Sequence, residues 1–114
     1  MKKLINSKDR IVDDMIYGYI AAHSDRVALW KNPRVVVRAS PKQVGNVGLV
    51  IGNGSGHEPI AMGWVGEGLL DANSVGEVFA APSSQLITDG IKAADFGVGT
   101  ILLISSHSGD ILNG

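Results

Sequence analysis

The chain has 114 residues, of which 45% are hydrophobic and 18% are charged, and its formal net charge is −1. These values are ordinary for one soluble globular domain or for part of a larger one. No stretch is strongly basic, so a nucleic-acid partner is not expected. The absence of cysteine excludes disulfides and thiolate metal sites, and it suits the cytoplasm, where we expect the protein to reside.

Neither a targeting segment nor a membrane span is expected from the sequence. Lys2 and Lys3 are followed by polar residues and not by the apolar h-region of a signal peptide. The longest apolar run, residues 101–104 with their flanks, is far too short to cross a bilayer. We therefore expect no membrane partner.

The first half of the chain reads as one helix and two strands. Apolar residues recur at three- and four-residue spacing over residues 8–23, which predicts an amphipathic helix that Ser7 can cap. Residues 34–38 are short and β-branched and follow an Asn-Pro turn, which predicts a strand. Residues 47–51 form a continuous apolar run, which is typical of a strand covered on both faces.

The second half alternates between helix and strand. Residues 60–70 are interrupted by glycines, which predicts short helical pieces with bends, and residues 77–81 predict a brief strand. A helix is expected from residues 82–84 to residue 95, and 100–104 reads as a second buried strand. A polar loop, residues 105–114, follows this strand.

The order of these elements indicates an α/β fold with a mixed, partly parallel sheet flanked by helices. A buried strand and a polar loop stand at the very end of the chain. We therefore expect residues 1–114 to be the front part of a larger domain.

The stretch GNGSGHEP, residues 52–59, is rich in glycine but matches no nucleotide motif. It lacks the Gly-Lys-Ser/Thr ending of a P-loop, and its third glycine comes one residue too early for G-x-G-x-x-G. What Gly52, Gly54 and Gly56 can provide is a backbone with positive φ and N–H groups exposed to a small ligand. Together with the net charge of −1, these departures predict that the chain binds no nucleotide.

Each of the two buried strands runs into a loop with acid–base side chains. The first loop supplies His57 and Glu58, and the second supplies His107 and Asp110. Ligands of open parallel sheets bind outside the carboxyl ends of the strands. We therefore expect His57 and Asp110 to face one pocket, where a histidine can donate or accept a hydrogen bond and a carboxylate can act as a general base.

Structural alternatives remain open for each of these residues. His57 can be a buried or capping histidine bonded to backbone, and Asp110 can fix a turn through an Asx-type bond. For Glu58, which precedes Pro59, we favour a role at the start of a helix. No HxH or HExxH spacing occurs, so a metal site is not expected.

Four segments together resemble a known family. In order and with suitable spacing, MKKLIN, GNGSGHEP, GEVFAAPS and SGDILN are similar to the dihydroxyacetone-binding subunit of phosphotransferase-linked dihydroxyacetone kinases. The resemblance covers essentially the whole chain and identifies residues 1–114 as the N-terminal part of the substrate-binding domain.

The resemblance implies an activity shared with a partner. A homodimeric subunit of this kind binds dihydroxyacetone and no cofactor of its own. A partner subunit carries ADP and Mg, delivers the phosphoryl group, and is recharged by a phosphotransferase protein. In the related single-chain kinases the donor is ATP.

The resemblance also assigns roles within the pocket. It implies that Gly54, Ser55, Gly56 and His57 line the substrate pocket. His57 would hydrogen-bond the triose and assist the deprotonation of its hydroxyl group, and Asp110 would be the second acid–base group. On this reading the glycines make room for a small polyol.

The chain departs from the family pattern at several positions. Ser105 and Ser106 stand where a Lys-Asn pair is usual, and His107 and Gly114 replace aromatic residues. Asn53 replaces a glycine. Because the usual lysine helps to hold the substrate, we assign Ser105 to the substrate-binding residues. We expect Ser105→Lys to tighten binding by about one to two orders of magnitude.

A later histidine of the family anchors the substrate carbonyl as a hemiaminal. The histidines here are His23, His57 and His107, and none stands in that context. Hence either the chain is a fragment or it does not perform the family reaction alone. The alternative function is a non-catalytic dihydroxyacetone-binding paralogue that acts as coactivator of a transcription regulator. A third reading is an unrelated α/β domain with glycine-rich turns.

Overall fold

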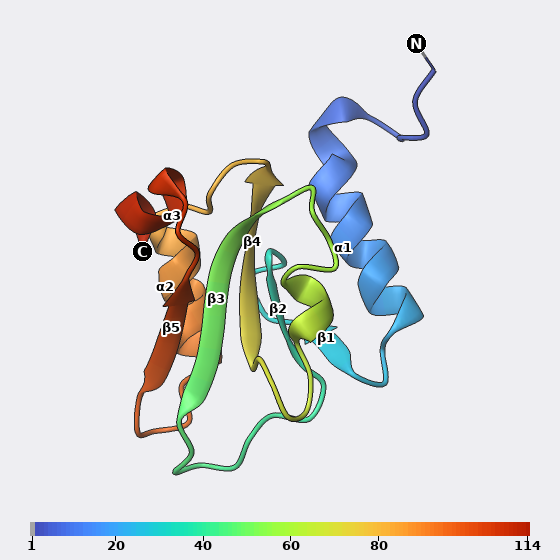
Figure 1. Ribbon diagram of the computed structural model, residues 1–114. Coiled ribbons are helices and arrows are strands. Elements are labelled where there is room, and N and C mark those ends of the chain that lie inside the picture. The colour runs from blue at the N-terminus through green and yellow to red at the C-terminus, as the bar shows by residue number, and fades with distance from the viewer. Residues whose placement is uncertain (1) are drawn as a thin grey trace.

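The computed structural model describes residues 2–114 of the chain. A five-stranded sheet with the strand order β1-β2-β4-β3-β5 forms its centre (Figure 1). β3 runs parallel to both β4 and β5, whereas β2 is antiparallel to β1 and to β4. The strands are β1 (Val27–Leu29), β2 (Val35–Arg38), β3 (Gly48–Ser55), β4 (Ala72–Val78) and β5 (Thr100–Ile104).

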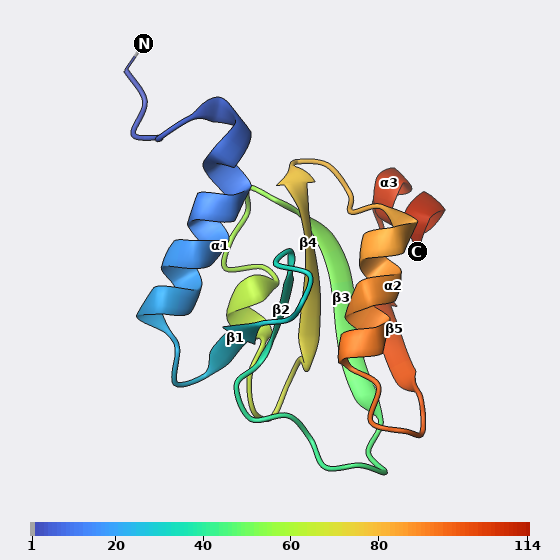
Figure 2. The same ribbon diagram turned by 180° about the vertical axis from the view of Figure 1, so that it is seen from behind.

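Helices cover both faces of this sheet. α1 and η2 lie on one face and α2 lies on the other, as the two opposite views show (Figures 1 and 2). The predicted α/β class with a mixed, partly parallel sheet is therefore confirmed. The helices are η1 (Lys8–Arg10), α1 (Ile11–Ala22), η2 (Met62–Trp64), α2 (Ser84–Ala93) and α3 (Ser108–Asn113).

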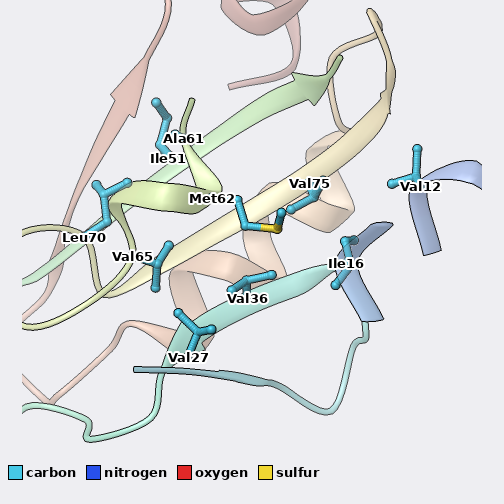
Figure 3. Close-up of a cluster of buried hydrophobic side chains, with 10 residues drawn as sticks. All are labelled: Val12, Ile16, Val27, Val36, Ile51, Ala61, Met62, Val65, Leu70 and Val75. Carbon is cyan, nitrogen blue, oxygen red and sulfur yellow. The ribbon is translucent and has the colours of Figure 1, made fainter. Parts of the chain in front are cut away.

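Two apolar clusters hold these layers together. Between α1, η2 and the sheet lies the cluster drawn in Figure 3, to which α1 contributes Val12 and Ile16, four residues apart on one helix face. The second cluster joins α2 to the other face. Successive side chains of a strand point to opposite faces, so Val50 packs in the α2 cluster and Ile51 in the α1 cluster. The predicted buried strand at 47–51 is confirmed from Gly48 on, whereas Val47 precedes β3 and is exposed.

β3 continues through half of the glycine-rich stretch. Gly52 and Gly54 lie in this strand, and only Gly56 has a positive φ, of 111°. A Cβ atom on Gly52 would lie 2.9 Å from Cγ1 of Ile87, and one on Gly54 would lie 2.8 Å from the carbonyl oxygen of Ala80. The expectation of positive φ at Gly52 and Gly54 is wrong, because these glycines allow close packing of protein against the strand.

β4 is the largest difference from the sequence prediction. A brief strand was expected at 77–81, but β4 spans Ala72–Val78 and lies in the middle of the sheet. Its polar side chains conceal it, because Asn73 and Ser74 are buried and Ser74 Oγ donates a hydrogen bond of 2.9 Å to the carbonyl of Leu86 in α2. The short strand β1 was also not predicted.

β5 was predicted as a buried strand and is instead an exposed edge strand. Among residues 2–114 it pairs only with β3, and Ile101 and Leu103 are 55% and 39% exposed. Neither side chain belongs to the apolar cluster beneath α1 and η2, and these helices lie over other strands of the sheet (Figure 1). After β5, residues 108–113 form α3 where a loop was expected.

The cap predicted at Ser7 is wrong, whereas α2 has a serine cap that was not predicted. Ser83 caps α2 by accepting a hydrogen bond of 3.2 Å from the backbone N–H of Leu86, at the expected start of this helix. Ser7 stands at the N-cap of η1, but its side chain makes no capping bond. As for membrane spans, residues 2–114 contain no helix with the length and apolar character that crossing a bilayer requires.

Candidate functional site

The parallel strands β3, β4 and β5 all end at the same edge of the sheet, the upper edge in Figure 1. The segments that follow them meet there around a cavity of about 620 Å³. Four of the predicted site residues line this cavity: Gly54, His57, Ser105 and Asp110. The structure therefore brings His57 and Asp110 to one place, although 53 positions separate them in the chain.

Asp110 lies in the first turn of α3 and is 8% exposed. Ser105 Oγ donates a hydrogen bond to its Oδ2 atom, whereas its Oδ1 atom is buried and has no hydrogen-bond partner within residues 2–114. Within the described part of the chain this carboxylate makes no Asx-type bond, so the turn-fixing alternative is wrong. A buried acceptor without a donor costs free energy. Oδ1 is therefore an acceptor suited to a ligand hydroxyl.

Two hydrogen bonds attach α3 to the start of α2 and so fix the position of Asp110. Asn113 Nδ2 donates to the carbonyl of Pro82 at 2.9 Å, and Ser84 Oγ donates to the carbonyl of Asn113 at 2.8 Å. A helix of six residues has little stability of its own. These tethers supply the order that the short helix lacks.

His57 follows the end of β3 and is exposed. Its Nε2 atom lies 3.3 Å from Nδ2 of Asn53. The alternative of a buried histidine bonded to backbone is therefore wrong. Glu58 accepts a hydrogen bond of 3.0 Å from the backbone N–H of Gly56, so it closes the loop; no helix begins at Glu58.

Two of the expected substrate-binding residues do not line the cavity. Ser55 is buried, and its Oγ atom donates a hydrogen bond of 2.6 Å to the carbonyl of Gly76. Gly56 lies against Phe79, whose ring would come within 2.6 Å of a Cβ atom at this position. Both residues shape the backbone around the cavity.

Phe79 and His107 line the cavity and were not assigned to the site from the sequence. Phe79 follows β4 and has a positive φ of 54°, which is rare for a bulky residue. It was missed because β4 itself was not recognised. No lysine or arginine of residues 2–114 lines the cavity. Among residues 2–114, Asp110 is therefore the one acidic residue of the lining, beside the histidines His57 and His107.

A second cavity, of about 460 Å³, lies beside Arg34. The Arg34 guanidinium binds Asp13 Oδ1 at 2.6 Å through Nε and Glu77 Oε1 at 2.9 Å through Nη2. Burial lowers the pKa of Arg34, but the hydrogen bonds to the two carboxylates outweigh this effect and raise the pKa above its ordinary value. These charged groups are satisfied by one another and are not free for chemistry.

Comparison with known proteins shows the family of the chain. The family model described as the Dak1 domain matches residues 17–114. The dihydroxyacetone-binding subunit of PTS-dependent dihydroxyacetone kinase 1 from Listeria innocua is 44% identical over 113 residues, which are 99% of this chain and 34% of that protein. The chain thus spans about a third of the length of this relative.

Solved structures of similar proteins superpose on this chain. The dihydroxyacetone kinase from C. freundii, in complex with AMP-PNP and Mg²⁺, superposes with a TM-score of 0.88 at 35% identity over 98% of this chain and 21% of that chain. A dihydroxyacetone kinase operon co-activator superposes with a TM-score of 0.81 at 26% identity, over 89% of this chain and 30% of that chain. The chain therefore belongs to the Dak1 domain family.

Proposed function

We propose that this chain binds dihydroxyacetone in the cavity at the ends of β3, β4 and β5, as part of a dihydroxyacetone kinase. The observation that carries the proposal is the buried, unpartnered Oδ1 atom of Asp110, which lines one cavity with His57. Support also comes from the relative in Listeria innocua, which is named as a dihydroxyacetone-binding subunit. The whole protein is a homodimer in the cytoplasm, with no nucleic-acid or membrane partner.

The proposed reaction uses the chain's own groups for one proton transfer. Oδ1 of Asp110 accepts the proton of a substrate hydroxyl group. At the same time, the oxygen of this hydroxyl group forms a bond to the phosphorus of the donor. The bond from phosphorus to the leaving oxygen of the donor breaks in the same transfer. His57 hydrogen-bonds another oxygen of the triose. Dihydroxyacetone phosphate is the product.

The phosphoryl donor is held by a partner subunit that carries ADP and Mg. Phosphoryl transfer needs cations near the transferred group. No lysine or arginine of residues 2–114 lines the cavity, so these cations come from the partner. A ketone with three carbons fills only a small part of 620 Å³, which leaves room for the donor's phosphoryl group.

Phosphoryl transfer by the complete protein with its partner subunit tests this proposal. Asp110→Asn should lower the rate by about 10²- to 10⁴-fold, because the amide cannot take the proton. Dihydroxyacetone binding, measured by calorimetry, should persist in this variant. Asp25→Asn removes an exposed carboxylate far from the cavity and serves as control. An unchanged transfer rate in Asp110→Asn would contradict the proposal.

A second candidate is a dihydroxyacetone-binding coactivator of a transcription regulator. It is favoured by the superposition with the operon co-activator and by the neutral pair Ser105 and Ser106. The same assay separates the two functions. A coactivator would bind dihydroxyacetone and the regulator, and it would transfer no phosphoryl group with any partner subunit.

We also propose that the chain itself binds no nucleotide. It has no P-loop lysine, and no lysine or arginine of residues 2–114 lines its cavity to bind a triphosphate. Calorimetric titration with ATP and magnesium should give no specific heat. A stoichiometric interaction in the micromolar range would contradict this expectation.

A further inference from the structure

The side chain of Asn53 is buried in β3, with 5% of the residue exposed, and it reaches toward His57. Its Nδ2 atom lies 2.9 Å from the carbonyl oxygen of Gly54, and 3.3 Å from both the carbonyl oxygen of Ile60 and Nε2 of His57. Two of these three neighbours are carbonyl oxygens, which only accept hydrogen bonds. The amide nitrogen, and not the amide oxygen, must therefore stand at this position.

This orientation determines the role of the histidine nitrogen. An amide NH₂ group only donates, so Nε2 of His57 must accept and must carry a lone pair. The proton of the neutral ring then sits on Nδ1. Gly54 takes one amide proton, and Ile60 and His57 share the second, since both lie at 3.3 Å. We propose that Asn53 is a positioning residue that fixes His57 in the Nδ1–H tautomer.

The tautomer determines which polar group of the cavity donates a hydrogen bond to a ligand and which one accepts. In this form His57 is a hydrogen-bond donor, because its single lone pair is already taken by Asn53. Oδ1 of Asp110 is the free acceptor. A donor and an acceptor on one cavity match a small neutral ligand with a hydroxyl group beside a second oxygen. This step rests on the proposed function, whereas the tautomer does not.

Nuclear magnetic resonance of the chain labelled with ¹⁵N-histidine tests the tautomer directly. At about pH 9 histidine rings are ordinarily neutral, and couplings from ring nitrogen to carbon-bound protons distinguish the two forms. His57 should show Nδ1–H. His57→Gln identifies its signals by their loss. A ring of His57 with its proton on Nε2 in the unmodified chain would overturn the proposal.

His23 provides an internal control. Its Nδ1 atom lies 2.7 Å from Nη2 of Arg26, and a guanidinium only donates. His23 must therefore accept at Nδ1, and its neutral ring should show the opposite form, Nε2–H. One spectrum thus contains both tautomers, each fixed by a different donor.

Substitution of Asn53 separates positioning from structural support. In Asn53→Ala the donor is lost, and His57 should shift to the Nε2–H form that free imidazole side chains prefer. Asn73→Ala removes a buried asparagine from the neighbouring strand β4 and should leave the tautomer of His57 unchanged. Retention of Nδ1–H in Asn53→Ala would overturn the proposal. The spectrum of the unmodified chain decides the matter if this variant does not fold.

Binding of dihydroxyacetone by the complete protein distinguishes this inference from the proposed function. Asn53→Ala should weaken binding about tenfold, which is the loss of one hydrogen bond of about 1.4 kcal/mol. A chain with the Nδ1–H tautomer and no affinity for dihydroxyacetone would contradict the proposed function alone. Binding together with an Nε2–H ring would contradict the role of Asn53 alone.

Discussion

Ser105 determines what stands beside the carboxylate of Asp110. Its hydroxyl group donates to Oδ2, so a lysine here would bring a cation to the same carboxylate and to the ligand oxygens. We expect Ser105→Lys to tighten dihydroxyacetone binding by about one to two orders of magnitude, through a charge-assisted hydrogen bond of roughly 1.5 to 3 kcal/mol. Calorimetry of both forms of the complete protein at one pH measures this change.

The control is Ser106→Lys, which adds the same charge at the next, exposed position. It should leave the affinity nearly unchanged. Unchanged or weaker binding in Ser105→Lys would mean that this pocket is built around the serine, and would favour the coactivator function.

Asp71 joins three parts of the chain at a buried point. Its carboxylate accepts from Arg38 Nη1 at 3.1 Å, from Lys42 Nζ at 2.7 Å and from the backbone N–H of Leu49 at 2.8 Å. Removing one partner of a buried ion pair leaves the other charge uncompensated. Asp71→Asn should therefore lower the free energy of unfolding by about 3 kcal/mol.

Urea denaturation measures this loss. Asp9→Asn, at an exposed position in η1, should change the free energy of unfolding by less than about 0.5 kcal/mol. A loss below about 1 kcal/mol in Asp71→Asn would show that water replaces the carboxylate around Arg38 and Lys42.

The site residues that the sequence revealed are those that follow apolar runs. His57, Ser105 and Asp110 come after β3 or β5, whose hydrophobic residues are easily recognised. Asn53 and Phe79 were not recognisable in this way. The role of Asn53 depends on the continuation of β3 through the glycines, and Phe79 is placed by β4, whose polar residues conceal it.

Whole elements were also predictable only where their apolar pattern matches their burial. β3 was predictable because its continuous apolar run reflects burial on both faces of the sheet. α2 was predictable because its apolar residues lie on the one helix face that packs against the sheet. β4 was not, since its central residues Asn73 and Ser74 are polar. Ser74 donates to a carbonyl in α2, whereas Oδ1 of Asn73 is buried without a hydrogen-bond partner within residues 2–114. β5 carries the apolar pattern of a buried strand, so its exposure cannot be read from its own residues.

The segment after β4 passes so close to the sheet that glycine is required beneath it. A Cβ atom on Gly76 would lie 2.4 Å from the carbonyl oxygen of Ala80 and 2.8 Å from the nitrogen of Pro82. Gly76→Ala should destabilise the fold by about 1 to 3 kcal/mol, because the backbone must move. Gly18, within α1, has no atom within 4 Å of such a Cβ.

Gly18→Ala is therefore the matched control. It should stabilise the fold by about 0.5 to 1 kcal/mol, since alanine favours a helix interior over glycine. Thermal unfolding compares the two variants. A loss of stability in Gly18→Ala as large as that in Gly76→Ala would contradict the packing argument.

Arg34 links α1 to the sheet through Asp13 and to β4 through Glu77. All three side chains are partly exposed, so Arg34→Met should cost only about 1 kcal/mol. The pKa of Arg34 is raised in the folded chain. Its contribution to the free energy of unfolding is therefore complete at a pH below its ordinary pKa, and it is lost only as the pH rises through the pKa of the folded chain.

The titration of Arg34 therefore adds no pH dependence to stability in the range of about pH 6 to 9. Urea unfolding of Arg34→Met and of the unmodified chain at both ends of this range measures the contribution. Salt should reduce the difference in the free energy of unfolding between Arg34→Met and the unmodified chain, because these charges are partly exposed. A difference that does not change with salt would show that Arg34 acts by packing alone.

In the molecule as a whole, helices cover the two faces of the sheet to different extents. α2 protects the face that carries Leu102, whereas the opposite face is covered by α1 and η2 only over the other strands (Figures 1 and 2). Ile101 and Leu103 lie on the uncovered part. Since β5 is also an edge strand, apolar side chains and unpaired backbone groups are exposed together.

An exposed apolar edge strand favours pairing with a second copy of the chain. We expect the 114-residue chain to self-associate reversibly at concentrations of tens to hundreds of micromolar. Leu103→Lys places a charge on this edge and should reduce the mean mass measured by sedimentation equilibrium, because pairing would bury the ammonium group. Leu4→Lys adds the same charge to a fully exposed position near the N-terminus and should have no such effect. Equal masses for all three forms would show that β5 does not mediate association, and a monomeric unmodified chain would contradict the expectation itself.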